Sequence, residues 1–122
     1  MSRPKIVIKR IYAAPEESDG VRVLVDRLWP RGVAKTAAEL DHWFKDIAPS
    51  PELRTWWNHD EKRMTEFAAR YEHELSDEDH RQAVDQMLEL IHGHDRVTLL
   101  YAAKDEHINH ALVLQDYLRR HS

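Results

Sequence analysis

The sequence of 122 residues contains no cysteine and only three glycines. Without cysteine the chain can form no disulfide, thiolate nucleophile, zinc ribbon or iron–sulfur cluster. With so few glycines, and none in a Gly-x-Gly-x-x-Gly or P-loop pattern, a glycine loop that cradles phosphate is not expected. The Gly-x-Ser-x-Gly elbow of serine hydrolases is missing as well. No cofactor is predicted from these residues.

Long apolar runs are also missing. The longest nearly apolar stretch covers residues 97–103, whereas a membrane-spanning helix needs about 20 residues. The N-terminal residues lead into alternating polar and apolar residues rather than the apolar core of a signal peptide. The sequence therefore predicts a cytoplasmic protein with no membrane partner.

Positive charge does not dominate the chain. Its 18 basic and 22 acidic residues give a net charge of −4, which argues against duplex nucleic acid as a partner because such binding depends on a basic face. A local basic pocket remains compatible with this balance. The length predicts one domain, spanning residues 1–122.

Three segments have the pattern of buried β-strands. Residues 6–11 are rich in β-branched side chains, residues 21–27 are apolar on nearly both faces, and residues 96–103 form a third apolar run. The second strand should end before Trp29-Pro30, because proline removes a backbone donor and restricts the residue before it. Residues 40–47 combine helical spacing with aromatic content, and an irregular segment or a strand is favoured there.

Four helices are predicted from caps and apolar stripes. Ser50-Pro51-Glu52 is a typical helix start, and a second helix follows Asp60 with a stripe that reaches residue 75. Ser76 and Asp79 form a partial capping box for a third helix, which Gly93 ends. Asp105 is expected to cap a last helix through about residue 120.

The order strand, strand, helices, strand, helix predicts the fold class. It indicates an α/β protein of two or three layers, a single compact domain with a mainly parallel sheet of a few strands covered by helices, and the apolar strands suggest that both faces of the sheet are covered.

The loop after the second strand has the residues of an anion site. It reads Asp26-Arg27-Leu28-Trp29-Pro30-Arg31-Gly32, and in open α/β sheets ligands bind beyond the carboxyl ends of strands. We predict that Asp26, Arg27, Trp29 and Arg31 bind a ligand, because arginine binds planar anions and stacks on tryptophan. The structural alternative pairs Asp26 with an arginine, places Trp29 in the core and leaves Arg31 in solvent.

A second polar loop follows the third strand. Lys104 and Asp105 are predicted ligand-binding residues, and Tyr101 and His110 are candidate catalytic acid–base groups, because a helix starts here and helix N-termini attract anions. The structural alternative makes Asp105 a helix cap, Tyr101 a core residue and His110 a partner of Asp26 or Asp105.

Four tryptophans are many for this length. Trp56 and Trp57 are adjacent on a predicted helix and point about 100° apart, so one of them should be exposed. Trp43, near the first loop, is added to the predicted ligand-binding residues. Tryptophans are more often core or interface residues than base-stacking platforms, so a homodimer stays open.

Histidines give no complete metal motif. Among nine histidines, His107 and His110 are spaced to share one face of a helix, but a metal site would require His107 to lie inside that helix. No metal site is predicted.

Three stretches carry a resemblance to a known family. They are residues 23–32 (VLVDRLWPRG), residues 43–50 (WFKDIAPS), and residues 99–105 (LLYAAKD) followed by Asn109-His110-Ala111. The sequence resembles the domain of unknown function 488 family, YeaO-like branch, over nearly the whole chain, which implies a small bacterial α/β protein. Other branches carry cysteine where Tyr101 stands and Cys-His-Arg where residues 109–111 stand. Only His110 matches, so the thiol chemistry that those cysteines suggest is not expected here.

The two loops together predict a function. We expect them to form one pocket that binds a small anionic ligand: a phosphate, a carboxylate or a nucleotide. One alternative is an enzyme that uses Tyr101 and His110 as acid–base groups in this pocket. Another is a protein or nucleic-acid interaction module that uses exposed tryptophans and basic residues. The first two hypotheses require Arg31 and His110 to lie close together.

Overall fold

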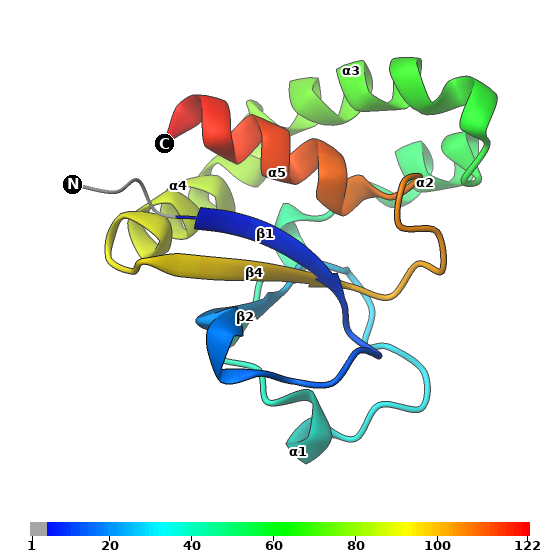
Figure 1. The fold of residues 1–122 in the computed structure, drawn as a ribbon. Coiled ribbons are helices and arrows are strands. Elements are labelled where there is room, and N and C mark those ends of the chain that lie inside the picture. The colour runs from blue at the N-terminus through cyan, green and yellow to red at the C-terminus, as the bar shows by residue number, and fades with distance from the viewer. Residues whose placement is uncertain (1–4) are drawn as a thin grey trace.

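The computed structural model describes residues 5–122. Its sheet has four parallel strands in the order β1-β4-β2-β3, where β1 is Lys5–Arg10, β2 is Val21–Leu24, β3 is His42–Trp43 and β4 is Arg96–Tyr101. Because all strands run in the same direction, their carboxyl ends share one edge, on the right in Figure 1, and the C-terminus lies at the opposite side. The predicted α/β class with a parallel sheet is confirmed.

Two strands are shorter than predicted, and Asp26 explains one of the ends. Residues 21–27 were expected in β2 and residues 96–103 in β4, but the strands end at Leu24 and Tyr101. Just beyond β4, the Ala102 N–H donates to Asp26 Oδ2 at 2.9 Å instead of to a neighbouring strand. The side chain thereby replaces a ladder hydrogen bond where the two strands diverge.

Helices cover one face of the sheet (Figure 1). The four predicted helices are present as α2 (Pro51–Trp57), α3 (Met64–Leu75), α4 (Glu78–His92) and α5 (His110–His121). Short 3₁₀ turns cover Glu17–Asp19, Lys45–Ile47 and Glu61–Arg63. Within the described residues, no helix combines the length and the apolar character that crossing a membrane requires.

The helix caps agree with the sequence at some positions only. Ser50 caps α2 as predicted, since its side chain accepts the Leu53 N–H. The helix start expected at Ser76 lies one residue later, where Asp77 accepts the His80 N–H.

The predicted cap at Asp105 is wrong. Asp105 Oδ1 accepts the N–H groups of His107 and Ile108 and so closes a turn before the helix. Asn109 caps α5 instead: its Oδ1 accepts the Leu112 N–H, and its Nδ2 donates to the Asp105 carbonyl. The Asp105 carboxylate thus accepts N–H groups as a helix cap does, but these N–H groups belong to a turn that ends before the helix begins.

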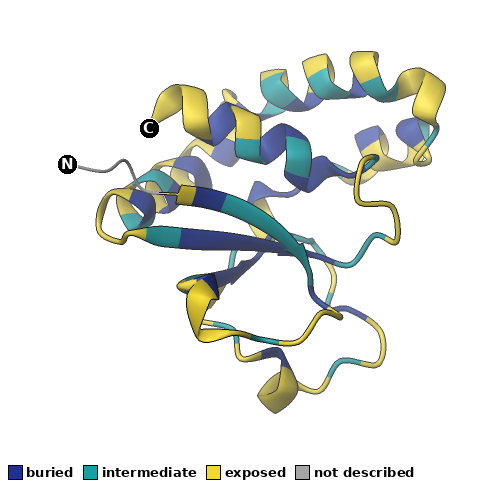
Figure 2. Ribbon diagram, viewed as in Figure 1, coloured by how far each residue is buried: buried dark blue, intermediate teal, exposed yellow. Residues whose placement is uncertain are grey.

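The main core lies between the sheet and helices α2 to α5 (Figure 2). The inward side chains of β2 and β4, among them Val23, Val97 and Leu99, are fully buried there. Trp57 is buried and stacks on Phe67 with ring centroids 3.8 Å apart, while Trp56 is half-buried. The two adjacent tryptophans therefore divide between core and surface, as their spacing on the helix predicts.

The second face is covered by loops rather than by the expected long helices. A smaller cluster of Ile11, Leu24, Ala38 and Leu100 lies beneath the segment that follows β2. This segment contains only the four-residue helix α1 (Lys35–Ala38), whose N-cap residue makes no side-chain hydrogen bond. Without an apolar stripe or a cap, its sequence carried no helix signal.

A buried ion pair and its hydrogen bonds connect β2 to this second layer. Arg22, 4% exposed, lies within β2, and its Nη1 donates to Asp19 Oδ2 at 2.5 Å, while its Nη2 donates to the Ala38 carbonyl at 2.8 Å. Lys9 Nζ lies 3.0 Å from Asp19 Oδ1. Burial raises the pKa of Asp19, but hydrogen bonds from the Glu16 backbone, Lys9 and Arg22 outweigh it, and the pKa lies below its usual value.

Candidate functional site

The loop after β2 meets the start of α5 at Asp26 and His110. His110 Nε2 lies 3.0 Å from the Val25 carbonyl oxygen and 3.3 Å from Asp26 Oδ1. The Asp26 carboxylate is anchored by the Ala102 N–H on its other oxygen. The structural alternative in which Asp26 is the partner of His110 is therefore confirmed, while the roles of both residues toward a ligand stay predictions.

The surroundings of His110 fix its tautomer. Both groups that face Nε2 are hydrogen-bond acceptors, so neutral His110 carries its proton on Nε2. Nδ1 makes no hydrogen bond to the described residues, and the residue as a whole is 8% exposed. A carboxylate that orients a histidine in this way leaves its other nitrogen free to act.

Several groups act on the pKa of His110. Burial has the largest effect and lowers the pKa, because it disfavours the charged imidazolium. The Asp26 carboxylate and the Val25 carbonyl raise it, whereas the charges of Arg54 and His59 lower it again. The net result is a pKa below the ordinary 6.5, so the ring is neutral at physiological pH.

Arg27 is the cation of this region that lacks an anionic partner. Its Nη2 donates to the carbonyls of Ala48 and Pro49 at 3.3 and 3.4 Å, which are long contacts. Its Nε is buried and meets no acceptor among the described residues. None of the ion pairs found within residues 5–122 includes Arg27 or Arg54.

Arg27 reaches these carbonyls because the segment before α2 is held in place by side chains. Tyr71 Oη donates to the Ile47 carbonyl at 2.7 Å, and His80 Nε2 lies 3.1 Å from the Ala48 carbonyl oxygen. The Tyr71 ring also packs edge-on against His110, with centroids 6.1 Å apart. Burial raises the pKa of Tyr71 well above its usual 10.0, so this phenol is a permanent hydrogen-bond donor.

Tyr101, the other candidate acid–base group, is a core residue at the end of β4. It is 2% exposed and belongs to the helix-side core. Burial raises its pKa, the charges of Glu106 and Asp105 add to the rise, and Arg10 opposes it. The phenol therefore stays protonated at neutral pH, and its catalytic role stays a prediction.

The predicted tryptophans of the site lie on the second face. Trp29 and Trp43 meet edge to face with ring centroids 5.4 Å apart, and both belong to the cluster under the loops. Their indole N–H groups donate to the carbonyls of Val33 and Asp26 at 2.8 and 2.7 Å. These hydrogen bonds hold the backbone of the loop, so both indoles have structural partners already.

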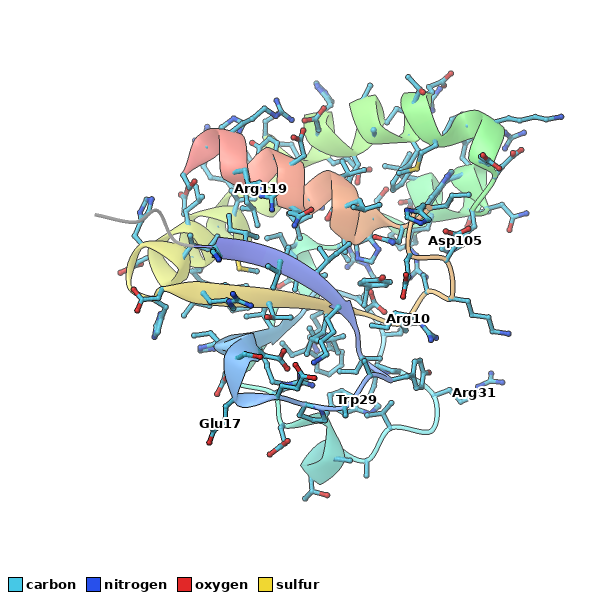
Figure 3. The ribbon with its side chains drawn as sticks, viewed as in Figure 1. Arg10, Glu17, Trp29, Arg31, Asp105 and Arg119 are labelled. Carbon is cyan, nitrogen blue, oxygen red and sulfur yellow. The ribbon has the colours of Figure 1, made fainter. Side chains whose placement is uncertain are left out.

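Arg31, Lys104 and Asp105 are exposed residues of the same edge. Figure 3 shows the Arg31 side chain extending away from the ribbon, and the Arg31 carbonyl accepts from Tyr12 Oη at 2.9 Å. Lys104 and Asp105 lie in the loop between β4 and α5, where Asp105 closes its turn.

The sheet therefore divides the predicted site. Asp26, Arg27, Tyr101 and His110 are on the side of the helices, while Trp29, Trp43 and the loop that carries Arg31 cover the other face. No contact described within residues 5–122 joins Arg31 to His110. The single pocket shared by both loops thus lacks structural support, and a helix-side site centred on Arg27 and His110 fits the geometry better.

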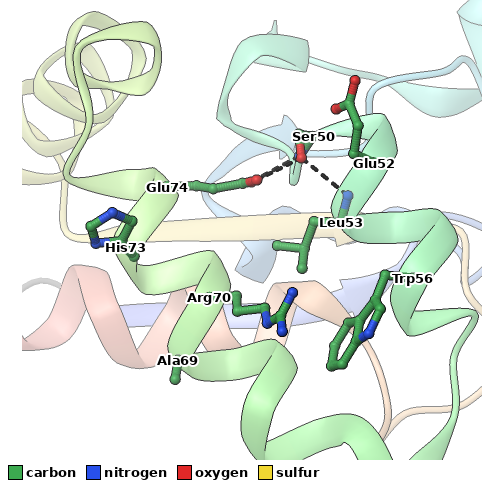
Figure 4. A pocket seen from close by; sticks show the side chains of 8 residues that line it. All are labelled: Ser50, Glu52, Leu53, Trp56, Ala69, Arg70, His73 and Glu74. Atoms are coloured by element: carbon green, nitrogen blue, oxygen red, sulfur yellow. Dashed lines mark hydrogen bonds between the residues drawn. The ribbon is translucent and has the colours of Figure 1, made fainter.

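The distinct hollows of the surface lie elsewhere. One, between α2 and α3, has a volume of about 490 Å³ and is lined by Leu53, Trp56, Arg70 and five other residues (Figure 4). Three of its polar side chains have partners: Glu74 accepts from the Ser50 hydroxyl at 2.5 Å, and Arg70 pairs with Glu66. None of the predicted site residues lines it.

Two neighbours of His110 were missed by sequence reasoning, Arg54 and His59. Arg54 is an exposed residue of α2, and His59 follows α2 with a φ of 53° and stacks on Trp57 at 4.5 Å. Neither stands in a pattern that the sequence could reveal, because the effect of their charges on the pKa of His110 depends on the fold.

Metal ligation gains no support. The described residues contain no cluster of three His, Asp or Glu side chains placed to hold a metal ion. His107 precedes α5, so it does not share a helical face with His110.

Comparison with known proteins agrees with the family resemblance. The family model described as the inactive DUF488-N3 subclade matches residues 5–122. The chain is 45% identical over 114 residues to the uncharacterised protein YeaO of Escherichia coli K12, covering 93% of this chain and 96% of that protein. It is 40% identical over 114 residues to the uncharacterised proteins Rv3073c of Mycobacterium tuberculosis and Mb3100c of Mycobacterium bovis, covering 93% of each chain. No solved structure matches the chain significantly. The chain therefore belongs to the DUF488 family, within the DUF488-N3 subclade that is described as inactive.

Proposed function

We propose that the protein binds a small anion, a phosphate or carboxylate group carried free or on a nucleotide, at the carboxyl edge of the sheet on the side of the helices. The observation that carries this proposal is Arg27, whose Nε–H is buried without an acceptor and whose charge has no carboxylate partner among the described residues. A buried charge is costly unless it is paired, and a guanidinium matches the two oxygens of a carboxylate or phosphate.

Three further basic groups support this location. Arg54 and His59 lie close enough to His110 to lower its pKa, and the charge of Arg27 acts on the neighbouring Tyr71. We call Arg27, Arg54, His59 and His110 the cationic corner. On the nearby Asp26 carboxylate, Oδ2 accepts the Ala102 N–H, while the buried Oδ1 lies 3.3 Å from His110 Nε2 and accepts no hydrogen bond from the described residues.

The other predicted residues have supporting roles in this proposal. Arg31 and Lys104 are exposed at the same edge, where their charges would attract an anion at longer range. Trp29 and Trp43 hold the loop after β2, and Asp105 shapes the loop before α5.

Binding is favoured over catalysis by two observations. The raised pKa of Tyr101 disfavours the phenolate that would act as a base, and the side chains whose charges reach His110 from α2 and the turn after it are basic rather than nucleophilic. The description of the subclade as inactive is consistent with a binding role.

The test is ligand-induced thermal stabilisation. The wild type is heated with acetate, inorganic phosphate or a nucleoside monophosphate, with ionic strength held constant by chloride because salt screens exposed charges. A ligand at 100 times its Kd stabilises by about 2.7 kcal/mol, which for 122 residues raises Tm by about 10 °C.

Two variants make the test specific. Arg27→Gln removes the unpaired cation, whereas Arg81→Gln makes the same charge change at an exposed position of α4. We expect the anion to raise the Tm of the wild type and of Arg81→Gln in a saturable way, and we expect this rise in Tm to be lost in Arg27→Gln. If no anion produces a saturable shift in the wild type, or if Arg27→Gln keeps the full shift, the proposed function is wrong.

A further inference from the structure

Resting on the proposed function, we propose that the cationic corner takes up its anion together with one proton, which binds to Nδ1 of His110. The inference concerns how the site is regulated, and it follows from the orientation of the imidazole and from the groups that surround it.

The first step is the orientation of the ring. The Val25 carbonyl, which accepts from Nε2, and the nearby Asp26 Oδ1 favour Nε2 as the protonated nitrogen, so the nitrogen left to bind a further proton is Nδ1. In neutral His110 this atom presents a lone pair, which repels the oxygen atoms of an anion. Once protonated, it presents a charged N–H donor, which forms the stronger type of hydrogen bond to an anion.

The second step is the balance of charge around the ring. From the end of β2, Asp26 faces His110, and the neutral Tyr71 of α3 packs edge-on against its ring. The charges of Arg54 of α2 and His59 of the following turn also act on the pKa of His110 and lower it. Asn109, which precedes His110, is uncharged, and the first turn of α5 has no acidic residue.

Without an anion, a proton on His110 therefore meets both the cost of burial and two basic neighbours, with Asp26 as its counter-charge. An anion in the corner would add negative charge beside Arg27, Arg54 and Nδ1, and protonation of His110 would become favourable. Because linkage is reciprocal, an anion that raises the pKa of His110 must bind more tightly as the pH falls.

The probe for this inference is sulfate, whose charge does not change over the pH range in which histidine titrates. Sulfate binding and the ring resonances of His110 are followed by NMR between about pH 5 and pH 8 at constant ionic strength. We expect sulfate to raise the pKa of His110 and to bind up to about tenfold more tightly for each unit of pH lost in the titration range.

Two histidine variants identify the proton's site. In His110→Gln the amide nitrogen can replace Nε2 at the Val25 carbonyl, but the titrating Nδ1 is gone, so the pH dependence of sulfate binding should flatten. In His59→Gln sulfate binding should weaken, because a member of the cationic corner is lost, but its pH dependence should persist. Since the wild-type ring resonances report on His110 directly, the outcome does not depend on the folding of His110→Gln.

The possible failures are distinguishable. If sulfate binds the wild type saturably at Arg27 but the pKa of His110 does not move, the inference is wrong while the proposed function stands. If the pH dependence disappears in His59→Gln and persists in His110→Gln, the inference is likewise wrong. If sulfate, acetate and phosphate do not bind at any pH, the proposed function fails and the inference with it.

Discussion

Replacing Asp19 by asparagine should destabilise the protein far more than breaking an ion pair on its surface. In Asp19→Asn the guanidinium of Arg22 remains buried, with the carbonyls of Ala38 and Glu39 but without its carboxylate at 2.5 Å. Removing one partner of a buried pair costs about 3–5 kcal/mol, since an uncompensated charge stays in the interior. For 122 residues this lowers Tm by about 12–20 °C.

The matched control is Glu66→Gln. Glu66 and Arg70 form an ion pair of the same 2.5 Å length on α3, but both side chains are about half exposed. Such pairs contribute about 0–1 kcal/mol, so this variant should lose less than about 4 °C. Chemical denaturation measures both free energies of unfolding at equilibrium. The double variant Asp19→Asn/Arg22→Met should recover part of the loss, because the fully buried guanidinium is removed as well and only the partly exposed Lys9 lacks its carboxylate.

The stability lost in Asp19→Asn should also depend on pH, and it should become smaller as the pH falls. Because the folded-state pKa of Asp19 lies below its ordinary 3.8, its contribution is fully present above that value and disappears as the pH falls through the lowered pKa. The difference between wild type and Asp19→Asn should therefore shrink in acid. A cost equal to that of Glu66→Gln, or a difference that grows in acid, would refute the reasoning.

Three further substitutions test other contacts. Tyr71→Phe keeps the ring but leaves a buried carbonyl without its donor, so urea denaturation should show a loss of about 1–3 kcal/mol; a neutral effect would mean that water replaces the hydroxyl. Gly20→Ala places a Cβ 2.4 Å from the Arg96 carbonyl oxygen at a φ of 66°, and Tm should fall by several degrees rather than rise as helix-favouring alanine substitutions do. Asn109→Ala should lower the unfolding free energy by about 1–2 kcal/mol, and a smaller loss than that of Asp105→Ala would contradict the cap observed here.

Local chemistry made much of the fold predictable from sequence. The strands were visible because β2 and β4 are buried on both faces and so consist of apolar runs. Ser50 was identified correctly because serine followed by proline has few other roles at that position. Asp105 was misjudged because a carboxylate can accept N–H groups in a turn as well as at a helix start, and only the path of the following residues distinguishes the two.

The features that could not be predicted depend on contacts between distant residues. Arg22 interrupts an apolar strand in the sequence, and only the fold brings the Ala38 carbonyl to Arg22 and Lys9 to Asp19. The candidate site was found in part: the pairing of Asp26 with His110 was among the alternatives, because both lie at strand ends. The distribution of the predicted site residues over both faces of the sheet was not foreseeable, because the face on which a loop lies depends on the path of the chain.

The position of β1 in the sheet has a consequence for the synthesis of the protein. As an edge strand, β1 pairs only with β4, so its first residue finds its partner at Arg96. The Ile6 carbonyl receives its side-chain donors still later, from Gln115 and Arg119 of α5. During synthesis on the ribosome, β1 therefore emerges before the strand with which it pairs. Its apolar residues have no β-strand partner until β4 has been made. A ribosome-bound chain that stops before β4 should remain sensitive to proteases throughout, whereas release of the full chain should confer protection in one step.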